Sequence, residues 1–256
     1  MQMRRALIDW IVHRHGVRRW TRAARRASDM PLAELRRERN MAHKLLYSLH
    51  EMTAVADNRL ALPMIGSNAF PKPHGTDWAW RPALWNLPLA SPGMSSAPSK
   101  SKLGDELTLF HDCARSELTL RQIRNTREAD LAPYGLRMDV FAFDGSFLSV
   151  VLDLPHGAVD GLKKRHLLRM TTIVELEKPL EIFARLNIKH GPNTEQIVRE
   201  LPLGDDEIVV EFDLAYSGLN EKRIERVWVD LIFENPEMSQ VVLRDLTFSR
   251  RPRAEF

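Results

Sequence analysis

The sequence predicts a mainly β protein, a jelly-roll-like antiparallel β-sandwich of about ten strands that follows an N-terminal α-helical hairpin. Three observations lead to this fold class. From Asp105 onward, apolar and polar residues alternate in short runs, which is typical of strands with one buried face. Turn signals such as Asp144-Gly145 separate these runs. In residues 1–60, apolar residues instead recur every three or four positions, as they do in amphipathic helices.

Residues 1–60 are expected to form a basic pair of helices. In the first helix one side is apolar and carries Met3, Ala6, Trp10, Val17, Trp20, Ala24 and Ala27. Most of the opposite side is arginine, including Arg14, Arg18, Arg22 and Arg25. Pro31 follows two residues that can cap a helix, Ser28 and Asp29, and suits the first turn of a second helix. The apolar stripe of that helix runs from Leu35 to about Leu60.

Residues 61–104 have the composition of a linker. Seven of them are proline and the segment ends in a stretch rich in Ser, Pro and Lys. Trp78, Trp80 and Trp85 also lie here and make up half of the six tryptophans. A solvated linker gains nothing from large apolar side chains. We therefore expect part of this segment to dock on a folded surface.

Residues 105–256 are expected to form the sandwich. Strands are predicted within 107–112, 117–124, 136–143, 147–154, 168–176, 180–189, 195–201, 207–214, 226–234 and 240–249. No helix-length segment interrupts them, as in all-β sandwiches. Because the alternation of core residues is complete within this range, we expect it to fold alone.

Composition and charge limit the remaining possibilities. The chain is 44% hydrophobic, enough for a full-sized core, and its single cysteine, Cys113, excludes an internal disulfide. Residues 1–60 hold 13 basic and 6 acidic residues, whereas residues 105–256 hold 20 and 27. No run of 18 apolar residues predicts a membrane span, and charges interrupt the N-terminus where a secretory signal needs an apolar region. We expect a cytoplasmic protein or one peripheral to a membrane.

The polar sides of the predicted strands hold the best candidates for a binding site. These residues are Arg137, Asp139, Phe141, Arg185, Asn187, Trp228 and Asp230. An aromatic ring can pack against the C–H groups of a sugar, while charged and amide groups bond its hydroxyls. The mixture predicts a saccharide-binding face. The alternative is that the helices or the tryptophan-bearing segment cover these aromatics.

Three stretches resemble a known group of β-sandwiches. They are 148–155 (LSVVLDLP), 227–233 (VWVDLIF) and 241–248 (VVLRDLTF), and they are similar to strands of the galactose-binding-like sandwiches found as carbohydrate-binding modules. The resemblance covers the C-terminal sandwich only and implies saccharide binding. It also implies a structural calcium ion between an early loop and the last strand, for which Asp105, Glu106 and Asp245 are the acids at comparable places.

The function predicted from these features is non-catalytic carbohydrate binding or surface recognition, with no cofactor other than the calcium ion. One alternative is a structural component that assembles through its N-terminal helices. Another is a glycan-active hydrolase, in which Asp139 and Asp153 could form a carboxylate pair. The chain has no glycine-rich phosphate loop, serine elbow or Cys/His cluster, so an enzyme is not indicated.

The basic helix has several candidate partners. Arg14, Arg18, Arg22 and Arg25 could meet an anionic membrane surface, with Trp10 and Trp20 at the interface. Nucleic acid would use the same charge but has no need of the tryptophans, and is not favoured. A protein partner, the acidic sandwich of the same chain, or a second copy in a homo-oligomer remain alternatives.

Overall fold

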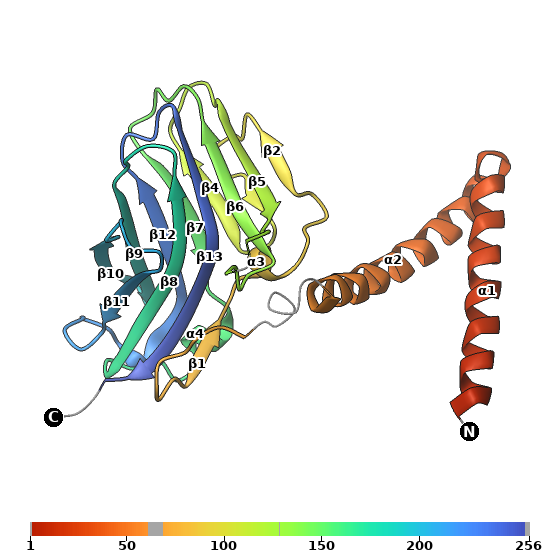
Figure 1. The fold of residues 1–256 in the computed structure, drawn as a ribbon, viewed down its shortest axis with the longest axis horizontal. Helices are drawn as coiled ribbons and strands as arrows, with labels where there is room; N and C mark the ends of the chain where they lie inside the picture. Colours follow the sequence, from red (N-terminus) through yellow and green to blue (C-terminus); the bar gives the residue numbers. More distant parts are fainter. Residues whose placement is uncertain (1, 61–68, 128, 254–256) are drawn as a thin grey trace. The chain divides into compact units, whose positions relative to one another are not determined.

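The computed structural model describes residues 2–60, 69–127 and 129–253. The chain divides into two compact units, a helical unit (Met1–Ala54) and a β-sandwich unit (Val55–Phe256). The sandwich unit confirms the predicted fold class, since it consists of two antiparallel sheets (Figure 1).

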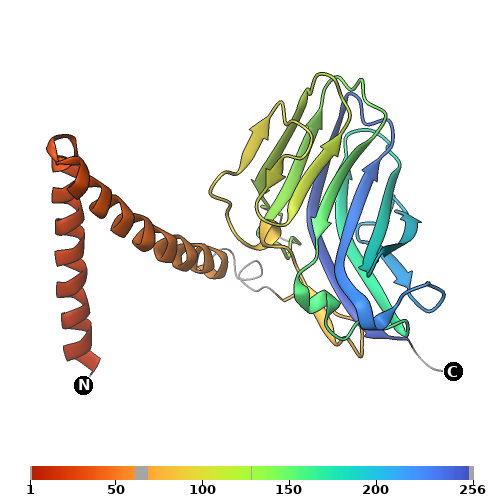
Figure 2. The same ribbon diagram turned by 180° about the vertical axis from the view of Figure 1, so that it is seen from behind.

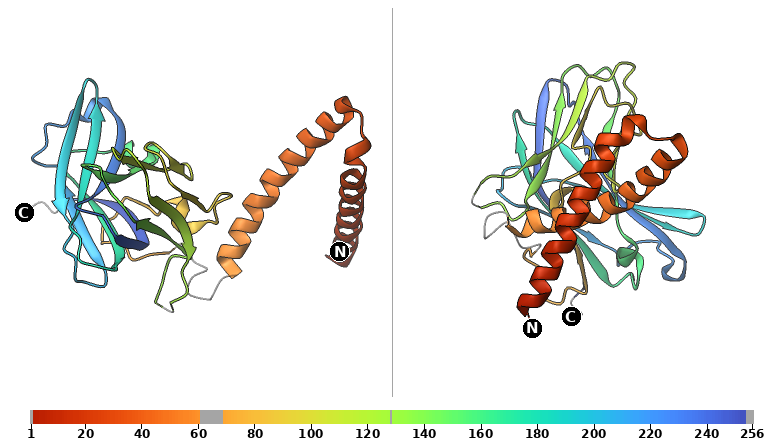
Figure 3. Two further views of the ribbon diagram at one scale, coloured as in Figure 1. Left: turned by 90° about the horizontal axis from the view of Figure 1, so that it is seen from above. Right: turned by 90° about the vertical axis from the view of Figure 1, so that its right-hand side faces the viewer.

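The expected pair of N-terminal helices is confirmed. α1 spans Gln2–Arg26, and a 3₁₀ turn, η1 (Ala27–Asp29), connects it to α2 (Leu32–Leu60). Each is one continuous helix (Figure 3). Pro31 directly precedes α2, and its carbonyl oxygen accepts the N–H of Leu35 at 2.9 Å. Of the apolar side expected on α1, the side chains of Met3, Ala6 and Trp10 lie outside the described residues, and Val17 is 52% exposed.

The described residues of the sandwich form thirteen strands in two sheets. Sheet A has the order β11-β8-β13-β6-β5-β2, with β1 also paired to β13, and sheet B has the order β10-β9-β12-β7-β4-β3. Figure 1 shows sheet A in front, with the long β13 between β8 and β6, and Figure 2 shows sheet B. The strands of sheet A are β1 (Trp78–Trp80), β2 (Gly93–Ser95), β5 (Leu118–Arg124), β6 (Tyr134–Val140), β8 (His166–Leu176), β11 (Ile208–Asp213) and β13 (Ser239–Pro252). Those of sheet B are β3 (Lys102–Leu103), β4 (Leu107–His111), β7 (Leu148–Asp153), β9 (Ile182–His190), β10 (Asn193–Glu200) and β12 (Ile224–Phe233).

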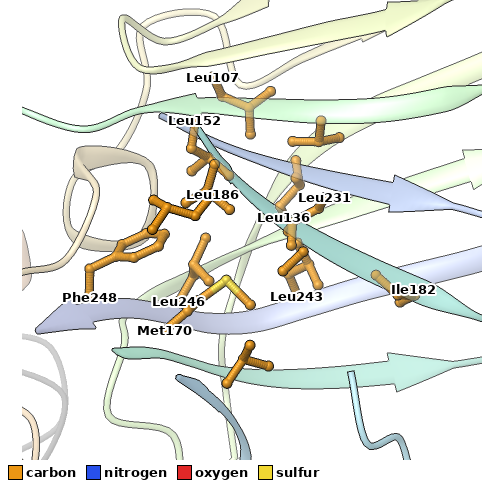
Figure 4. Close-up of a cluster of buried hydrophobic side chains, with 14 of the residues drawn as sticks. Leu107, Leu136, Leu152, Met170, Ile182, Leu186, Leu231, Leu243, Leu246 and Phe248 are labelled. Atoms are coloured by element: carbon orange, nitrogen blue, oxygen red, sulfur yellow. The ribbon is translucent and has the colours of Figure 1, made fainter. Parts of the chain in front are cut away.

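The core lies between the two sheets and consists of the residues whose alternation predicted the strands. Leu152, Leu186 and Leu231 of sheet B face Met170 and the β13 side chains of sheet A (Figure 4). All are buried, as expected for the inward face of each strand.

The described part of the expected linker belongs to the sandwich, which corrects the boundary predicted at Asp105. We call residues 69–104 the tryptophan segment. It contains β1, β2, β3 and the short helix α3 (Ala83–Asn86). Trp80 stacks on Phe248 with ring centroids 5.8 Å apart. Trp85 is fully buried, and its indole N–H donates to the carbonyl oxygen of Leu243 at 3.0 Å. The tryptophans therefore add buried apolar surface to the core, which the proline-rich composition of the segment did not indicate.

A buried ion pair also fixes the tryptophan segment to β13. The Nε and Nη2 atoms of Arg81 donate to the two carboxylate oxygens of Asp245 at 2.9 and 2.7 Å. Both residues are buried, and the guanidinium of Arg81 also lies 5.0 Å from the centroid of the Phe70 ring. Two parallel bonds make this a bidentate pair. It joins residues that are 164 positions apart in the sequence.

A second cluster holds the start of β1. Asp77 accepts a 2.9 Å bond from Arg250 Nε and lies 3.4 Å from the Nε2 atom of the buried His166. The Nδ1 atom of His166 accepts the N–H of Lys163 at 3.0 Å, so the neutral ring is the form that fits. Burial lowers the pKa of His166; Asp77 acts in the opposite direction, and Arg250, Arg165 and Lys163 lower the pKa further.

The lowered pKa of His166 predicts that folding stability depends on pH. Since the folded-state pKa lies below the unfolded value of about 6.5, the unfolded state binds more protons and folding stability falls as pH drops below that value. His166→Gln keeps an acceptor for Lys163 but does not titrate. Urea unfolding at several pH values between about 8 and 5 should show a smaller loss of stability in this variant than in the wild type. Equal losses in both proteins would contradict this assignment.

Candidate functional site

The predicted site residues lie on the outer faces of two different sheets. Arg137 and Asp139 are on β6 of sheet A, whereas Arg185, Asn187, Trp228 and Asp230 are on β9 and β12 of sheet B. The two sheets are packed face to face, with the core between them. The expectation that all these residues share one side is therefore wrong. Alternation within a strand fixes which residues point outward, but not which sheet the strand joins.

The sheet A group is small and mostly self-paired. Arg137 Nε donates to Asp139 Oδ1 at 2.8 Å, and Gln240 Nε2 donates to the same oxygen at 2.9 Å. Phe141 follows the end of β6 and is 54% exposed, so it is not covered within the sandwich. The cross-strand neighbours of Arg137 and Asp139 in the register of β5 are Arg121 and Thr119, neither of which is aromatic. Their partners on β13, Val242 and Gln240, are not aromatic either, so Phe141 is the one ring near this pair in the registers described.

Sheet B brings the other four residues together with Gln196 and Arg226, which the sequence did not single out, and with Asp153, which was considered only for a hydrolase pair. The strand register aligns Gln196, Asn187, Trp228 and Asp153 in one row across β10, β9, β12 and β7. The adjacent row is Val198, Arg185, Asp230 and Val151, and Arg226 lies two positions before Trp228 on the same side of β12. We call this surface, formed by Arg185, Gln196, Arg226, Trp228 and Asp153 over Asn187 and Asp230, the Trp228 face.

Asn187 and Asp230 form a buried layer of the Trp228 face. One Asp230 oxygen accepts from Arg185 Nε at 2.8 Å and from Asn187 Nδ2 at 3.1 Å. The Asn187 side-chain oxygen accepts from Gln196 Nε2 at 2.9 Å. Both inner residues are almost fully buried, while Gln196 is exposed and the Arg185 side chain is 37% exposed. Asn187 and Asp230 therefore position Arg185 and Gln196, which reach solvent.

Trp228 is half-buried, with Arg226 over its ring and Asp153 beside Arg226. The guanidinium of Arg226 lies 4.8 Å from the ring centroid, and Arg226 Nε donates to Asp153 Oδ1 at 2.8 Å. Asp153 is also the cross-strand neighbour of Trp228 on β7. The tryptophans of β1 pair with β13 of sheet A, so they do not cover this face. In the sequence, Gln196, Arg226 and Asp153 stand at outward, polar positions of their strands. Only the register between the strands shows that they meet at Trp228.

A cavity at one end of the sandwich had no sequence signal. It has a volume of about 520 Å³ and is lined by loop residues that include Phe143, Phe147, Lys178, Asn235 and Met238. Met238 N–H donates to the carbonyl oxygen of Phe141 at 3.0 Å, which brings two chain segments together here. The cavity has fewer fixed polar side chains than the Trp228 face, and we treat it as the competing site.

The acids proposed for calcium do not fit a calcium site. Both oxygens of Asp245 are bonded to Arg81, so a guanidinium already balances that charge. Glu106 Oε2 accepts the N–H of Ala83 at 2.7 Å, and burial raises the pKa of its carboxyl group. Asp105 is exposed. Among the described residues, no three side chains of the types His, Cys, Asp and Glu are grouped so as to hold a metal ion.

The proposed hydrolase pair is also excluded by the topology. Asp139 is on the outer face of sheet A and Asp153 is on the outer face of sheet B. Packed sheets lie about 10 Å apart, and outward side chains add to that separation. The two carboxylates cannot flank one glycosidic bond, which needs both on the same side.

The four arginines proposed for an anionic surface are all exposed on α1. Arg14, Arg18, Arg22 and Arg25 are spaced so that they follow one another along the helix. Their binding to an anionic membrane or to a protein stays a prediction. In the part of the chain that the structure describes, no helix has both the length and the apolar character that crossing a bilayer requires.

Comparison with solved structures finds β-sandwiches of the kind that the sequence resembles. A family 11 carbohydrate-binding module from Clostridium thermocellum shares 12% identity with a TM-score of 0.39, and the match covers 65% of this chain and 99% of that one. The CBM22-1 xylan-binding domain from Paenibacillus barcinonensis Xyn10C shares 11% identity with a TM-score of 0.34, covering 64% and 94%. Tailspike protein 4 of Bacteriophage CBA120 shares 9% with a TM-score of 0.41, covering 60% of this chain but only 21% of that one.

Likenesses of this size carry no information about a ligand. The search of curated proteins gave no match. A family model, in contrast, matches residues 1–256. The chain belongs to that family, DUF6478, a family of unknown function.

Proposed function

We propose that this protein binds a saccharide through the Trp228 face and has no catalytic activity of its own. The observation that supports the proposal is the row across β10, β9, β12 and β7, in which a half-buried tryptophan lies between an amide and a carboxylate. A sugar ring has apolar C–H groups on its faces and hydroxyls at its edge. An aromatic plane bordered by donors and acceptors matches that distribution.

The polar groups of the Trp228 face are held in place before a ligand arrives. Asp230 and Asn187 fix Arg185 and Gln196, and Asp153 fixes Arg226. Binding therefore immobilises few flexible side chains, and the entropic cost of ordering them is reduced. The exposed groups provide both guanidinium donors and a carboxylate acceptor, so neighbouring hydroxyls can bond in pairs.

Affinity is expected to be modest. Sugars are well hydrated, so each new hydrogen bond contributes only about 0.5–1.5 kcal/mol, and stacking on one ring contributes a similar amount. Three or four such contacts, at about 1 kcal/mol each, correspond to a dissociation constant on the order of 1–10 mM for a short oligosaccharide.

Trp228→Ala is expected to weaken binding about two- to tenfold, because the stacking contribution is lost. The measurement is affinity electrophoresis of the full chain in gels containing mixed-linked β-1,3-1,4-glucan, xylan or β-1,4-galactan. The wild type should be retarded by at least one polysaccharide. Since the Trp228 ring is only half-buried, the variant should lose no more than about 1–2 kcal/mol of folding stability.

Tyr216→Ala is a matched control for this experiment. Tyr216 is 85% exposed and lies in the loop after β11, and the Arg253 guanidinium is 5.6 Å from its ring centroid, much as Arg226 is placed over Trp228. The control should migrate like the wild type. A wild-type chain that none of the polysaccharides retards, or equal retardation of wild type and Trp228→Ala, would contradict the proposal.

A further inference from the structure

α2 carries a seven-residue repeat along one side. Apolar residues and one glutamate follow one another in steps of three and four, at Leu35, Glu38, Ala42, Leu45, Leu49, Met52 and Ala56. A strict repeat of this kind has a period of 3.5 residues, slightly shorter than the 3.6 of a straight helix. It is typical of a helix that packs along the length of another helix. We call these seven positions the α2 seam.

Within the helical unit, only the first part of the α2 seam is covered. Leu35, Glu38 and Ala42 are half-buried, and Glu38 accepts a 3.3 Å bond from Arg19 of α1. From His43 to Thr53 every described side chain of α2 is exposed. The exposed fractions are 43% for Leu45, 44% for Leu49 and 59% for Met52 on the seam, and 41%, 49% and 47% for the flanking Met41, Leu46 and Val55.

We propose that this uncovered part of the α2 seam is an interface between two copies of the chain. The positions that border it are Met41, Leu46, Ser48, Thr53 and Val55, none of which is charged. Two identical copies can therefore meet without like charges at the edge of the contact, where repulsion would otherwise prevent self-association. The charged and histidine side chains of this stretch, His43, Lys44, His50 and Glu51, lie away from the seam.

Two other occupants fit less well. An anionic lipid surface favours helices with many Lys or Arg residues along the border of the apolar side, but between His43 and Thr53 the only such residue is Lys44. The α1 helix of a second copy carries the exposed arginines Arg14, Arg18, Arg22 and Arg25, and the uncovered seam and its border offer no carboxylate to pair with them. A seam that is uncharged fits a second α2 best.

The available area reaches the size of a specific interface. Met41, Leu45, Leu46, Leu49, Met52 and Val55 are each 41–59% exposed. Covering them would bury about 500 Å² on each copy and about 1,000 Å² in total, which is near the lower limit for a specific contact.

If the protein also binds saccharides as proposed above, two copies would present two Trp228 faces. A polysaccharide with repeated binding units would then be held at both, which raises the apparent affinity well above that of one face. A short oligosaccharide that reaches only one face would show no such gain. This consequence rests on the proposed function, whereas the interface itself does not.

The test is the mass of the full chain by sedimentation equilibrium at concentrations up to about 100 µM, where a contact of this size is expected to be populated. The wild type should give twice the chain mass of 29.5 kDa. Leu45→Glu/Leu49→Glu/Met52→Glu should give the mass of one chain, because six carboxylates would then meet across the interface. Glutamate is a strong helix former, so circular dichroism should show unchanged helix content.

Tyr47→Glu is the matched control, since Tyr47 is 73% exposed and lies on the opposite side of α2 from Leu45 and Leu49. This variant should remain a dimer. A single-chain mass for the wild type, or an unchanged dimer in the triple variant, would overturn the proposal. So would a monomeric wild type that sediments with phosphatidylglycerol vesicles through these three residues. Binding of a short oligosaccharide should be equal in all variants, which separates this outcome from failure of the Trp228 face.

Discussion

A chain that begins at Asp105 is expected to show no cooperative unfolding transition. Such a fragment lacks β1, β2, β3 and α3, and with them the fully buried Trp85. Loss of a buried tryptophan side chain alone costs about 3–5 kcal/mol, and a typical domain is stable by only about 5–15 kcal/mol. The fragment would also leave Asp245 buried without Arg81. Together these losses exceed what the remaining strands can offset.

Differential scanning calorimetry measures this directly. A chain that begins at Val55 keeps the whole sandwich unit and should unfold in one transition, as small single domains usually do. The chain that begins at Asp105 should give none, and Trp85→Ala in the full chain should lower stability by about 3–5 kcal/mol. A cooperative transition of the Asp105 fragment at a similar temperature would show that the tryptophan segment is dispensable.

Arg81→Met is expected to destabilise the sandwich by about 3–5 kcal/mol, because it leaves the buried Asp245 carboxylate without its partner. Burial raises the pKa of Asp245, while Arg81 opposes that shift; without Arg81 the pKa should rise further. A raised folded-state pKa means that the ionised form is disfavoured in the fold. The cost is therefore present at pH 7 and disappears as pH falls below the unfolded-state value of about 3.9.

Guanidinium chloride unfolding at neutral and acid pH measures both effects. The difference between wild type and Arg81→Met should shrink as the solution is acidified. Arg81→Met/Asp245→Leu should regain most of the lost stability, because no unpaired charge remains. Lys189→Met removes an exposed pair with Glu225 and should change stability little. A loss in Arg81→Met that is independent of pH would argue that packing against Phe70, and not charge, is what the arginine provides.

The fold could be predicted because its strands have one buried face. Alternation at Leu168 and Met170, or at Ile182, Leu186 and Ile188, identifies the inward residues without any knowledge of the partner strand. The tryptophan segment could not be predicted in the same way. Its strands are two or three residues long, too short to alternate, and prolines separate them. Trp85 was the signal that it docks, but the place where it docks depends on contacts with Leu243, far along the chain.

The candidate site was predictable only in part, for a related reason. The alternation within each strand identified Trp228 and Arg185 as outward residues. It did not show that they share a face with Gln196, or that Asp139 lies on the other sheet. Sheet membership and register are set by pairing between distant segments, which alternation does not encode. The calcium prediction was wrong for the same reason, because it could not include a contact between distant segments. The partner of Asp245 is Arg81, which lies in the segment expected to be a linker.

The most direct test of saccharide binding at the Trp228 face is the indole N–H region of the NMR spectrum during titration with the oligosaccharide that corresponds to the retarding polysaccharide. The chain has six tryptophans, and Trp228→Phe identifies the signal of Trp228. That signal should shift progressively with ligand, together with the side-chain amide of Gln196, while the signals of the buried Trp85 and of the loops around Phe147 and Met238 stay in place. An unchanged Trp228 signal with shifts confined to the Phe147 and Met238 loops would contradict the account and assign the ligand to the cavity at the end of the sandwich.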